Sequence, residues 1–458
     1  MRPRQQRVLE RYLERYAEPE IVAARMARGR WDHVLVVPAL AESPSFVTGF
    51  LPALASAPGR ALMIVVVNAR VDSAHADQLA NRHCVEELSS LGALQQLTPS
   101  AALVNLPEGD LLLVDRGEAP RLFPRDQGVG LARKIGADIA LALQVGGQLD
   151  ARMIGFSDAD AQLPRDYFAR LASLDGVAIA AFPFVHTPAA EHALEQASQE
   201  YELWLRYYVL GLAWAESPFA MHTIGSTLAI DVATYAHVRG VPKRLAGEDF
   251  HLVNKALKIG AGRRLRGAPV ELEARRSTRV PFGTGPALER LESAGPMPFA
   301  HPEAFSTLLH MHQALFRCST ERSLRPLDAA IQELAAPVRG VCAEFFAAGS
   351  LRDQLQLAVD QCATLSGRLA RTRHNFDGLQ TWRLLRRLRD DAIGAVGWSE
   401  AVQSAPFLPG ASSNLRDALA QAERCEANLA PQLAPLSSKD HRSPVHDGMR
   451  PRSANAGY

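Results

Sequence analysis

Two aspartates one residue apart follow a short apolar run in the segment IGFSDADAQLP, residues 154–164. At the end of a strand, side chains two positions apart point the same way, so Asp158 and Asp160 can share one ligand. One carboxylate can then bind a metal while the other contacts a ribose or a metal-bound water. Hard oxygen ligands favour Mg²⁺ or Mn²⁺ over zinc. Two solvated aspartates in a loop are the alternative.

A second acidic pair, Glu248 and Asp249, stands just before the amphipathic pattern of GEDFHLVNKALKIG, residues 247–260. Acids at a helix start interact favourably with the positive end of the helix dipole, which is a purely structural role. A carboxylate held at such a place can also act as a general base towards a hydroxyl nucleophile. Both roles can hold for different members of the pair.

Glycine and positive charge come together in QGVGLARKIGADIALAL, residues 127–143. Gly128 and Gly130 before a helix let backbone amides approach an anion, and Arg133 and Lys134 add positive charge where a diphosphate would sit. The segment lacks the complete phosphate-loop and dinucleotide-binding patterns, which disfavours a kinase or a dehydrogenase. A flexible helix start without a ligand is the alternative.

Further candidates come from three other stretches. In VVPALAES, residues 36–43, a buried strand is broken at Pro38, and the following Ala39 and Glu42 would offer groups to a base or ribose. His222 would complete a metal shell, although a lone histidine in an apolar stretch is more often a hydrogen-bonded core residue. The basic stretch ARRSTRVPFGTGPA, residues 274–287, contains Arg275, Arg276 and Arg279 and would close over a diphosphate or an anionic acceptor.

The elements that must position these side chains are strands. Continuous apolar runs at 33–40, 61–69, 111–115 and 152–160 are separated by helical or loop segments. This alternation predicts strands buried on both faces of a largely parallel α/β sheet, with ligands beyond the carboxyl ends of the strands. The residues that this arrangement places along one edge are Pro38, Asn68, Asp115, Asp158 and Asp160.

The sequence predicts four regions. Residues 1–30 have the periodicity of an amphipathic helix, and residues 31–300 carry the α/β pattern. Residues 301–430 are rich in Ala, Leu, Gln and Arg at helical spacing, which predicts a mostly helical region that selects the acceptor, mediates dimerisation or braces the core. Residues 431–458 contain few large apolar residues and predict a disordered tail.

Composition excludes several classes of protein. Fifty basic and 49 acidic residues among 458 leave a formal net charge of +1, so no global field recruits nucleic acid. The five cysteines are widely spaced, without the pattern of a zinc module or disulfide framework, which fits the cytoplasm. No apolar run is long enough for a membrane span. The basic amphipathic segment 381–391 can lie on anionic lipid, so peripheral membrane contact remains an alternative to a solvated helix face.

Taken in order, the four motifs resemble those of the GT-A-fold nucleotide-sugar glycosyltransferases, in particular family 2. The matching stretches are 38–42, 128–134, 158–160 and 248–249, and the resemblance covers about residues 31–285. It implies a Rossmann-like GT-A core with a mostly parallel sheet. It also implies that Asp160 is the main metal ligand, that Asp158 contacts the ribose or the metal, and that Asp249 deprotonates the acceptor hydroxyl.

The resemblance implies a hexosyltransferase-like enzyme that uses Mg²⁺ or Mn²⁺ to move a sugar from a nucleotide-sugar donor to a hydroxyl acceptor, with inversion. Because a Q-x-x-R-W motif and transmembrane helices are missing, a non-processive transfer is expected. Asn68 stands where such enzymes often carry an acid that reads the base, so the base stays open. Two alternatives remain, a retaining transferase to a small acceptor and a noncatalytic scaffold with a GT-A-like core. The acceptor and the oligomeric state are also open.

Overall fold

The computed structural model describes residues 3–276 and 284–433, and the chain divides into two compact units. Unit 1 comprises residues 1–201 and 221–295, and unit 2 comprises residues 202–220 and 296–458. This division differs from the predicted contiguous domains, because residues 202–220 belong to the second unit. The reason is packing, since Leu203, Tyr207 and Leu210 are buried in the hydrophobic core of unit 2. The predicted disordered tail lies almost wholly outside the described residues.

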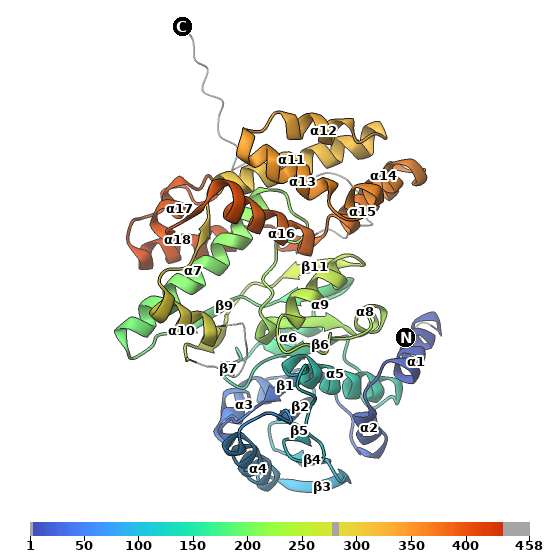
Figure 1. The fold of residues 1–458 in the computed structure, drawn as a ribbon. Helices are drawn as coiled ribbons and strands as arrows, with labels where there is room; N and C mark the ends of the chain where they lie inside the picture. The colour runs from blue at the N-terminus through green and yellow to red at the C-terminus, as the bar shows by residue number, and fades with distance from the viewer. Residues whose placement is uncertain (1–2, 277–283, 434–458) are drawn as a thin grey trace. The chain divides into compact units, whose positions relative to one another are not determined.

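Unit 1 is built around a large sheet (Figure 1). The strands that unit 1 contributes to it are, in chain order, β1 (His33–Ala39), β2 (Ala61–Asn68), β3 (Ala93–Thr98), β4 (Ala101–Asn105), β5 (Asp110–Arg116), β6 (Met153–Phe156), β8 (Val177–Ala181), β10 (Leu228–Asp231) and β11 (Ala261–Arg264). Across the sheet they lie in the order β11-β8-β10-β6-β1-β2-β5-β4-β3. Strands β5, β2, β1 and β6 run parallel, whereas β10 runs antiparallel to both of its neighbours.

The central strands have the composition that buried parallel strands require. Every residue of β1 and β2 is buried, and Val36 of β1 pairs in register with Ile64 of β2. A strand covered on both faces has no solvent side on which polar residues would alternate, so its sequence is continuously apolar. The prediction of a mixed α/β fold with a large, mostly parallel sheet is confirmed.

Helix α5 (Val129–Val145) covers the centre of this sheet. It contacts β1 and β2, and most of its residues are buried. Gly136 permits this approach, because a Cβ there would stand 2.4 Å from a methyl carbon of Val36. The other α-helices of unit 1 that follow β1 are α3 (Leu51–Ala55), α4 (His75–Ser90), α6 (Tyr167–Ala172), the start of α7 (His192–Trp214), α8 (Val232–His237), α9 (Glu248–Leu257) and α10 (Thr284–Ala294).

The predicted N-terminal helix is divided into three pieces. They are α1 (Pro3–Arg15), the short 3-10 helix η1 (Pro19–Ile21) and α2 (Val22–Met26). The single helix predicted over residues 1–30 was wrong because Glu18 has an extended conformation and Pro19 begins a new helical turn. A proline is tolerated at a helix start but breaks a helix interior.

Unit 1 also contains a small second sheet. It contains β7 (Ala161–Gln162), β12 (Val270–Glu273) and β9 (Phe184–Thr187), in the order β7-β12-β9. Strand β12 pairs antiparallel with β7, with Leu272 opposite Ala161. This pairing ties the chain just after Asp160 to the chain just before Arg275.

Unit 2 is mainly helical. Its helices are the second half of α7, α11 (Pro302–Glu321), α12 (Arg325–Gln332), α13 (Ala336–Ala347), α14 (Leu351–Gln361), α15 (Leu365–Asn375), α16 (Gly378–Leu388), α17 (Trp398–Ser404) and α18 (Leu415–Ala427), with a π-helical turn at Arg389–Ile393. Strands β13 (Phe299–Ala300) and β14 (Ala395–Val396) form a short antiparallel pair. Within the described ranges, no helix has the length and apolar character needed to cross a bilayer.

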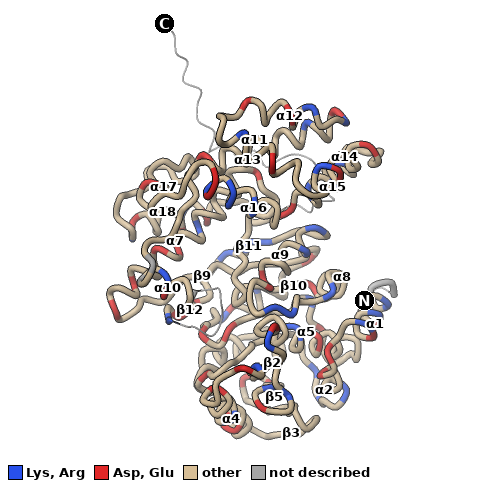
Figure 2. The backbone as a smooth tube through the Cα atoms, viewed as in Figure 1, with Lys and Arg blue, Asp and Glu red and all other residues tan. Residues whose placement is uncertain are grey.

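The basic segment 381–391 falls on α16 and the π-helical turn. Arg386 lies 3.3 Å from Asp390, Arg387 lies 3.1 Å from Asp391, and Arg389 contacts Asp390 at 2.7 Å. Neighbouring acids therefore neutralise part of the charge of this segment, as the interspersed red and blue in Figure 2 shows.

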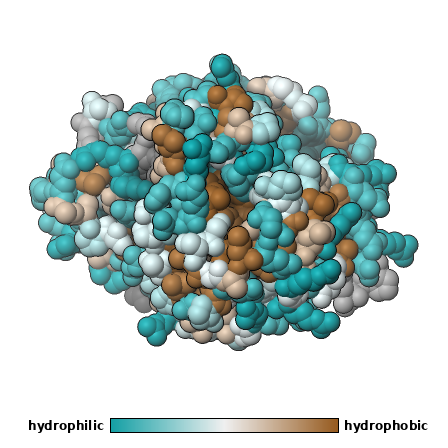
Figure 3. All heavy atoms as spheres, turned by 90° about the horizontal axis from the view of Figure 1, so that it is seen from below, coloured by the Kyte–Doolittle hydropathy of each residue, from teal (hydrophilic) through white to brown (hydrophobic). Residues whose placement is uncertain are grey.

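On the face of the molecule drawn in Figure 3, hydrophobic residues lie in several groups among hydrophilic ones. Contact with a lipid surface stays a prediction.

Candidate active site

Arg133 stands at the centre of the site and joins two of the predicted motifs. Its guanidinium donates hydrogen bonds to the carboxylate of Asp158, after β6, and to the carboxylate of Glu248, the first residue of α9. The side chains of Arg133 and Glu248 are 6% and 2% exposed, so the ion pair between them is shielded from water. The fold thus brings acids that lie 90 positions apart in the sequence to one buried cation.

A glycine makes room for this cation. Gly225, in the 3-10 helix η3 (Gly225–Thr227), faces the guanidinium so closely that a Cβ there would stand 2.5 Å from Nη2 of Arg133. Nothing in the sequence near Gly225 connects it with Arg133, which lies 92 positions earlier. Only the tertiary structure shows which side chain requires the missing Cβ.

Burial changes the proton affinity of these groups. Burial raises the pKa of Glu248 to about 7, although the charge of Arg133 acts in the opposite direction. The pKa of Asp158 is also raised by burial and is likewise opposed by Arg133. Burial alone would lower the pKa of Arg133, but its acidic neighbours outweigh this effect and raise it. Arg133 therefore stays charged and holds the cluster together.

Asp249 is oriented by backbone amides. Its carboxylate accepts a hydrogen bond of 3.1 Å from the amide of Gly225 and one of 2.7 Å from the amide of Phe250. The left-handed conformation of Gly247, with φ of 74°, starts α9 so that both acids lie in its first turn. Burial raises the pKa of Asp249, which strengthens it as a proton acceptor while it remains ionised.

A second arginine holds the remaining acids. The guanidinium of Arg275 donates to both carboxylate oxygens of Glu42, at 3.0 and 2.5 Å, and its Nε donates to Oδ2 of Asp160 at 3.1 Å. Burial raises the pKa of Asp160, and the nearby charge of Asp158 raises it further. The sequence marks Arg275 only as part of a basic loop and does not predict its contact with Asp160.

Asn68 lies at the end of β2 and fixes the end of β1. Its side-chain amide donates to the carbonyls of Ala39, at 3.0 Å, and Val66, at 3.2 Å. Asn81, which sequence reasoning missed, donates to the Asn68 carbonyl at 3.0 Å and accepts from the Ala41 amide at 2.8 Å. Ala41 has a positive φ of 52°, so these bonds hold a tight turn that leads to Glu42. Pro38 and Ala39 themselves are buried within β1.

Two predicted anion-binding groups are occupied elsewhere. The ammonium of Lys134 is bound at 2.7 Å by each of Tyr12, the Tyr16 carbonyl and Asp138, on a side of α5 that Arg133 does not face. The amide of Gly130 donates to the carbonyl of Arg244 at 3.1 Å, and a Cβ on Gly130 would collide with the carbonyl of Pro242. In this structure neither group points at Asp158. Arg279 lies outside the described residues.

His222 is a buried histidine beside an aromatic ring. It packs edge to face on Phe184 with 4.9 Å between the ring centroids. In the described part of the chain, no group of three or more His, Cys, Asp or Glu side chains is arranged to hold a metal ion. The structure therefore favours a role for His222 in the core. The prediction that His222 binds a metal rests on the sequence alone.

The charge balance of the cluster fits a further cation. Five carboxylates, those of Glu42, Asp158, Asp160, Glu248 and Asp249, surround two guanidinium groups. Magnesium in proteins is commonly held by one or two carboxylates, together with substrate phosphates and water, so a complete protein cage is not required. Asp158 and Asp160 fit such a partial site, and Figure 2 shows red segments close to the ends of the central strands.

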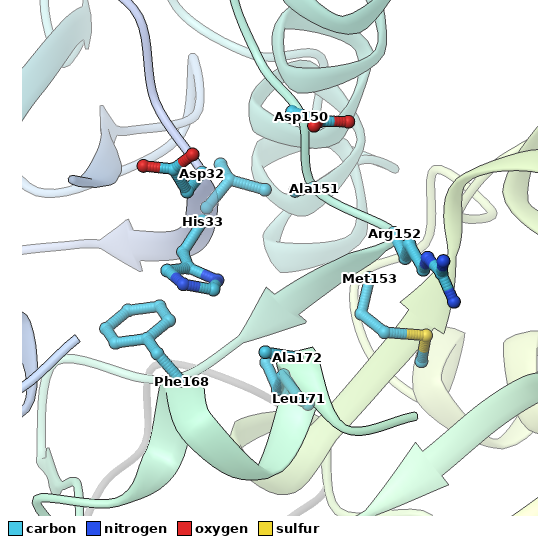
Figure 4. A pocket seen from close by; sticks show the side chains of 10 residues that line it. Asp32, His33, Asp150, Ala151, Arg152, Met153, Phe168, Leu171 and Ala172 are labelled. Carbon is cyan, nitrogen blue, oxygen red and sulfur yellow. The ribbon is translucent and has the colours of Figure 1, made fainter. Parts of the chain in front are cut away.

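A separate pocket lies at the opposite end of the strands. It has a volume of about 150 Å³ and is lined by Asp32, His33 and Arg152, at the amino ends of β1 and β6, and by Phe168 of α6 (Figure 4). His33 contacts the carbonyl of Pro58 at 2.9 Å, so its ring is held by the protein. The carboxyl-end cluster, and not this pocket, contains the predicted motifs.

Comparisons with known proteins add little to this picture. No family model and no curated protein matches the sequence. Among solved structures, one similar chain is the mannosyltransferase PcManGT from Pyrobaculum calidifontis in complex with GDP-Man and Mn²⁺. The match covers 81% of this chain and 93% of that chain, with 15% identity and a TM-score of 0.32. Similarity at this level carries no argument about activity, so the function must be inferred from the residues of the site.

Proposed function

We propose that this chain is a metal-dependent glycosyltransferase that moves a sugar from a nucleotide-sugar donor to a hydroxyl acceptor. The observation that carries the proposal is the bridge from Asp158 to Glu248 through Arg133. It joins the two acidic motifs at the carboxyl edge of a mostly parallel sheet, where ligands of such sheets bind. The GT-A family 2 assignment is part of this proposal.

The two acidic pairs take different roles. Asp160, with Asp158, would hold Mg²⁺ or Mn²⁺ on the donor side. When bound, such a metal neutralises charge that develops on the diphosphate leaving group. Arg133 would add a fixed positive charge beside it, in a place where water is excluded and electrostatic effects are strong. Glu42 and Asn68 would shape the loop that meets the base and ribose.

On the acceptor side, Asp249 would act as the general base. The acceptor oxygen forms a bond with C1 of the sugar as the bond from C1 to the diphosphate oxygen breaks. The hydroxyl proton passes to Asp249, and the nucleoside diphosphate departs. Glu248 would position Arg133 without touching the substrate. Direct displacement of this kind inverts the sugar, whereas product of retained configuration would favour the alternative of a retaining transferase.

The first test is release of nucleoside diphosphate from UDP-, GDP- and dTDP-sugars with Mn²⁺, with Mg²⁺ and with a chelator. We expect one donor to be hydrolysed slowly with metal, and Asp160→Ala to abolish both release and metal-dependent nucleotide binding. Asp249→Ala should keep donor binding but lose transfer to an acceptor. Asp175→Ala serves as the control, because its exposed carboxylate pairs with Arg152 at the surface, away from the acidic cluster.

Two outcomes would contradict the proposal. Unchanged turnover in folded Asp160→Ala or Asp249→Ala would remove that residue from the mechanism. If every donor failed both to bind and to react, the chain would instead be a noncatalytic scaffold. A cytoplasmic location and a non-processive, single transfer belong to the same proposal, and the size of the product formed with an acceptor checks the latter.

A further inference from the structure

Arg275 follows strand β12, which is fixed beside the segment that contains Asp158 and Asp160. Strand β12 pairs with β7, and the amide of Glu273 donates to the backbone carbonyl of Asp160 at 3.1 Å. Arg275 follows two residues later, and its guanidinium lies between the carboxylates of Asp160 and Glu42. This backbone contact holds the main chain of Asp160 beside β12. The pairing of β12 with β7 therefore places Arg275 next to the Asp160 carboxylate.

The contacts of Arg275 have the geometry of a specific bridge. Both Nη atoms face the two oxygens of Glu42, and Nε faces Oδ2 of Asp160. The planar guanidinium pairs with both oxygens of the Glu42 carboxylate at once. The ammonium of a lysine is a single charged point and does not reproduce this bidentate geometry. The side chains are 29%, 12% and 28% exposed for Arg275, Glu42 and Asp160, so the bridge is only partly screened by water.

A guanidinium in this place competes with a metal. A divalent ion bound to Oδ2 of Asp160 would stand within a few ångströms of the guanidinium, and like charges at such a distance repel, more strongly in a partly buried site than in water. A metal on Oδ2 of Asp160 would therefore weaken the contact of the guanidinium with the same oxygen.

We propose that Arg275 is an internal counter-ion that occupies the metal side of Asp160 in the donor-free protein, and that metal binding displaces it. This inference rests on the proposed function. In the empty site the guanidinium balances the acidic cluster and keeps metal affinity low. When a nucleoside diphosphate enters, the displaced guanidinium gains phosphate oxygens as new partners, so metal and nucleotide bind with positive coupling.

The test measures Mn²⁺ binding to the full chain by the electron paramagnetic resonance signal of free Mn²⁺, without nucleotide. We expect Arg275→Gln to bind Mn²⁺ about tenfold more tightly than the unmodified protein, a typical size for coupling between two sites. Arg275→Lys keeps a charge but loses the fork and should fall between them. Arg352→Gln is the matched control, because Arg352 makes a similar two-point pair with the exposed Asp328, at 2.9 and 3.0 Å, outside the acidic cluster.

A second arm adds UDP or GDP. In the unmodified protein the nucleotide should raise Mn²⁺ affinity strongly, whereas in Arg275→Gln the gain should be several-fold smaller. Equal Mn²⁺ affinity in the unmodified protein and in both Arg275 variants would overturn the counter-ion role and leave the proposed function standing. If no protein binds Mn²⁺ even with nucleotide, both proposals fail. Should Arg275→Gln not fold, the Arg275→Lys comparison decides.

Discussion

Tyr12 and Asp138 lie 126 positions apart in the sequence, and the phenol of Tyr12 donates a 2.6 Å hydrogen bond to the fully buried carboxylate of Asp138. Tyr235 donates to the same oxygen at 2.6 Å, and the amide of Glu18 and the ammonium of Lys134 donate to the other. The N-terminal helix is therefore fastened to α5 by a buried polar network, on the helix that also supplies Arg133 to the site.

This network predicts that Lys134 contributes to stability and not to donor binding. Lys134→Met leaves the Asp138 carboxylate buried without its cation, which typically costs about 3–5 kcal/mol. We expect that loss in the free energy of unfolding, measured by urea denaturation, and an unchanged nucleotide affinity in calorimetry under conditions where the variant is folded.

The control for this prediction is Lys243→Met. Lys243 is exposed and contacts Glu18 at 3.2 Å, so its removal should change stability by no more than about 1 kcal/mol. The opposite pattern in Lys134→Met, with normal stability and weakened donor binding, would restore the anion-binding role that the sequence predicted.

Arg133 should be needed for both stability and activity. Arg133→Met leaves the buried Glu248 without its cation and removes the charge beside Asp158. We therefore expect a loss of about 3–5 kcal/mol in the free energy of unfolding. The rate of sugar transfer should fall about 100-fold or more, as when a fixed charge-stabilising group is removed from an active site.

The double variant Arg133→Met, Glu248→Met separates these effects. Removing both partners of a buried ion pair leaves no stranded charge at Glu248, so part of the lost stability should return. Activity should stay low, because the fixed charge beside Asp158 is still missing. Recovery of activity along with stability would show that Arg133 serves only the fold.

Gly225 should tolerate no side chain. The Cβ of Gly225→Ala would stand 2.5 Å from Arg133, whose guanidinium cannot give way easily because carboxylates hold it on two sides. We expect a stability loss of about 1–3 kcal/mol, typical of overpacking, and a lower transfer rate in a donor turnover assay.

Gly340→Ala is the matched substitution in open space. Gly340 lies within α13, and no described atom outside the backbone of its own helix lies within 4 Å of the position that a methyl group would take. The change should therefore raise stability by about 0.5–1 kcal/mol through helix propensity alone. If Gly225→Ala raises stability as Gly340→Ala does and leaves the transfer rate unchanged, the close approach of Gly225 to Arg133 matters for neither stability nor activity.

The strands that position the site were readable from the sequence because burial on both faces leaves continuous apolar runs. The run at 61–69 became β2 at 61–68, and the run at 33–40 became β1 at 33–39. Strands β3 and β11 were not foreseen. Their sequences, ALQQLT and AGRR, have neither a continuous apolar run nor a clear alternation, so pairing with β4 and β8 decides their conformation.

The acidic motifs of the site were also visible, but their partners were not. Arg133 and Lys134 are adjacent, and successive residues on a helix face different directions, so only one of them can meet Asp158. Nothing in the local sequence says which one. The bridge from Arg275 to Glu42 joins residues 233 positions apart and depends on the β12 to β7 pairing. Contacts of that kind are set by topology, which a motif does not contain.

The last prediction concerns His312 of α11, in unit 2. Its Nδ1 donates to the carbonyl of Ala215 at 2.7 Å, and burial lowers the pKa of the ring to about 4 from an ordinary value of 6.5. The folded state therefore keeps the ring neutral, while the unfolded chain takes up a proton below pH 6.5. Stability from this residue is complete above that pH and is lost as the pH falls from 6.5 towards 4, by about 2 kcal/mol at pH 5.

Urea denaturation at pH 7.5 and at pH 5 measures this loss. Other groups titrate over the same range, so the informative quantity is the difference between the unmodified protein and His312→Gln, whose side chain has no proton to gain. The variant should lose about 2 kcal/mol less on acidification than the unmodified protein. His83→Gln, at an exposed position, should follow the unmodified protein. Parallel losses in all three would mean that His312 accepts its proton as readily in the folded state as in the unfolded chain.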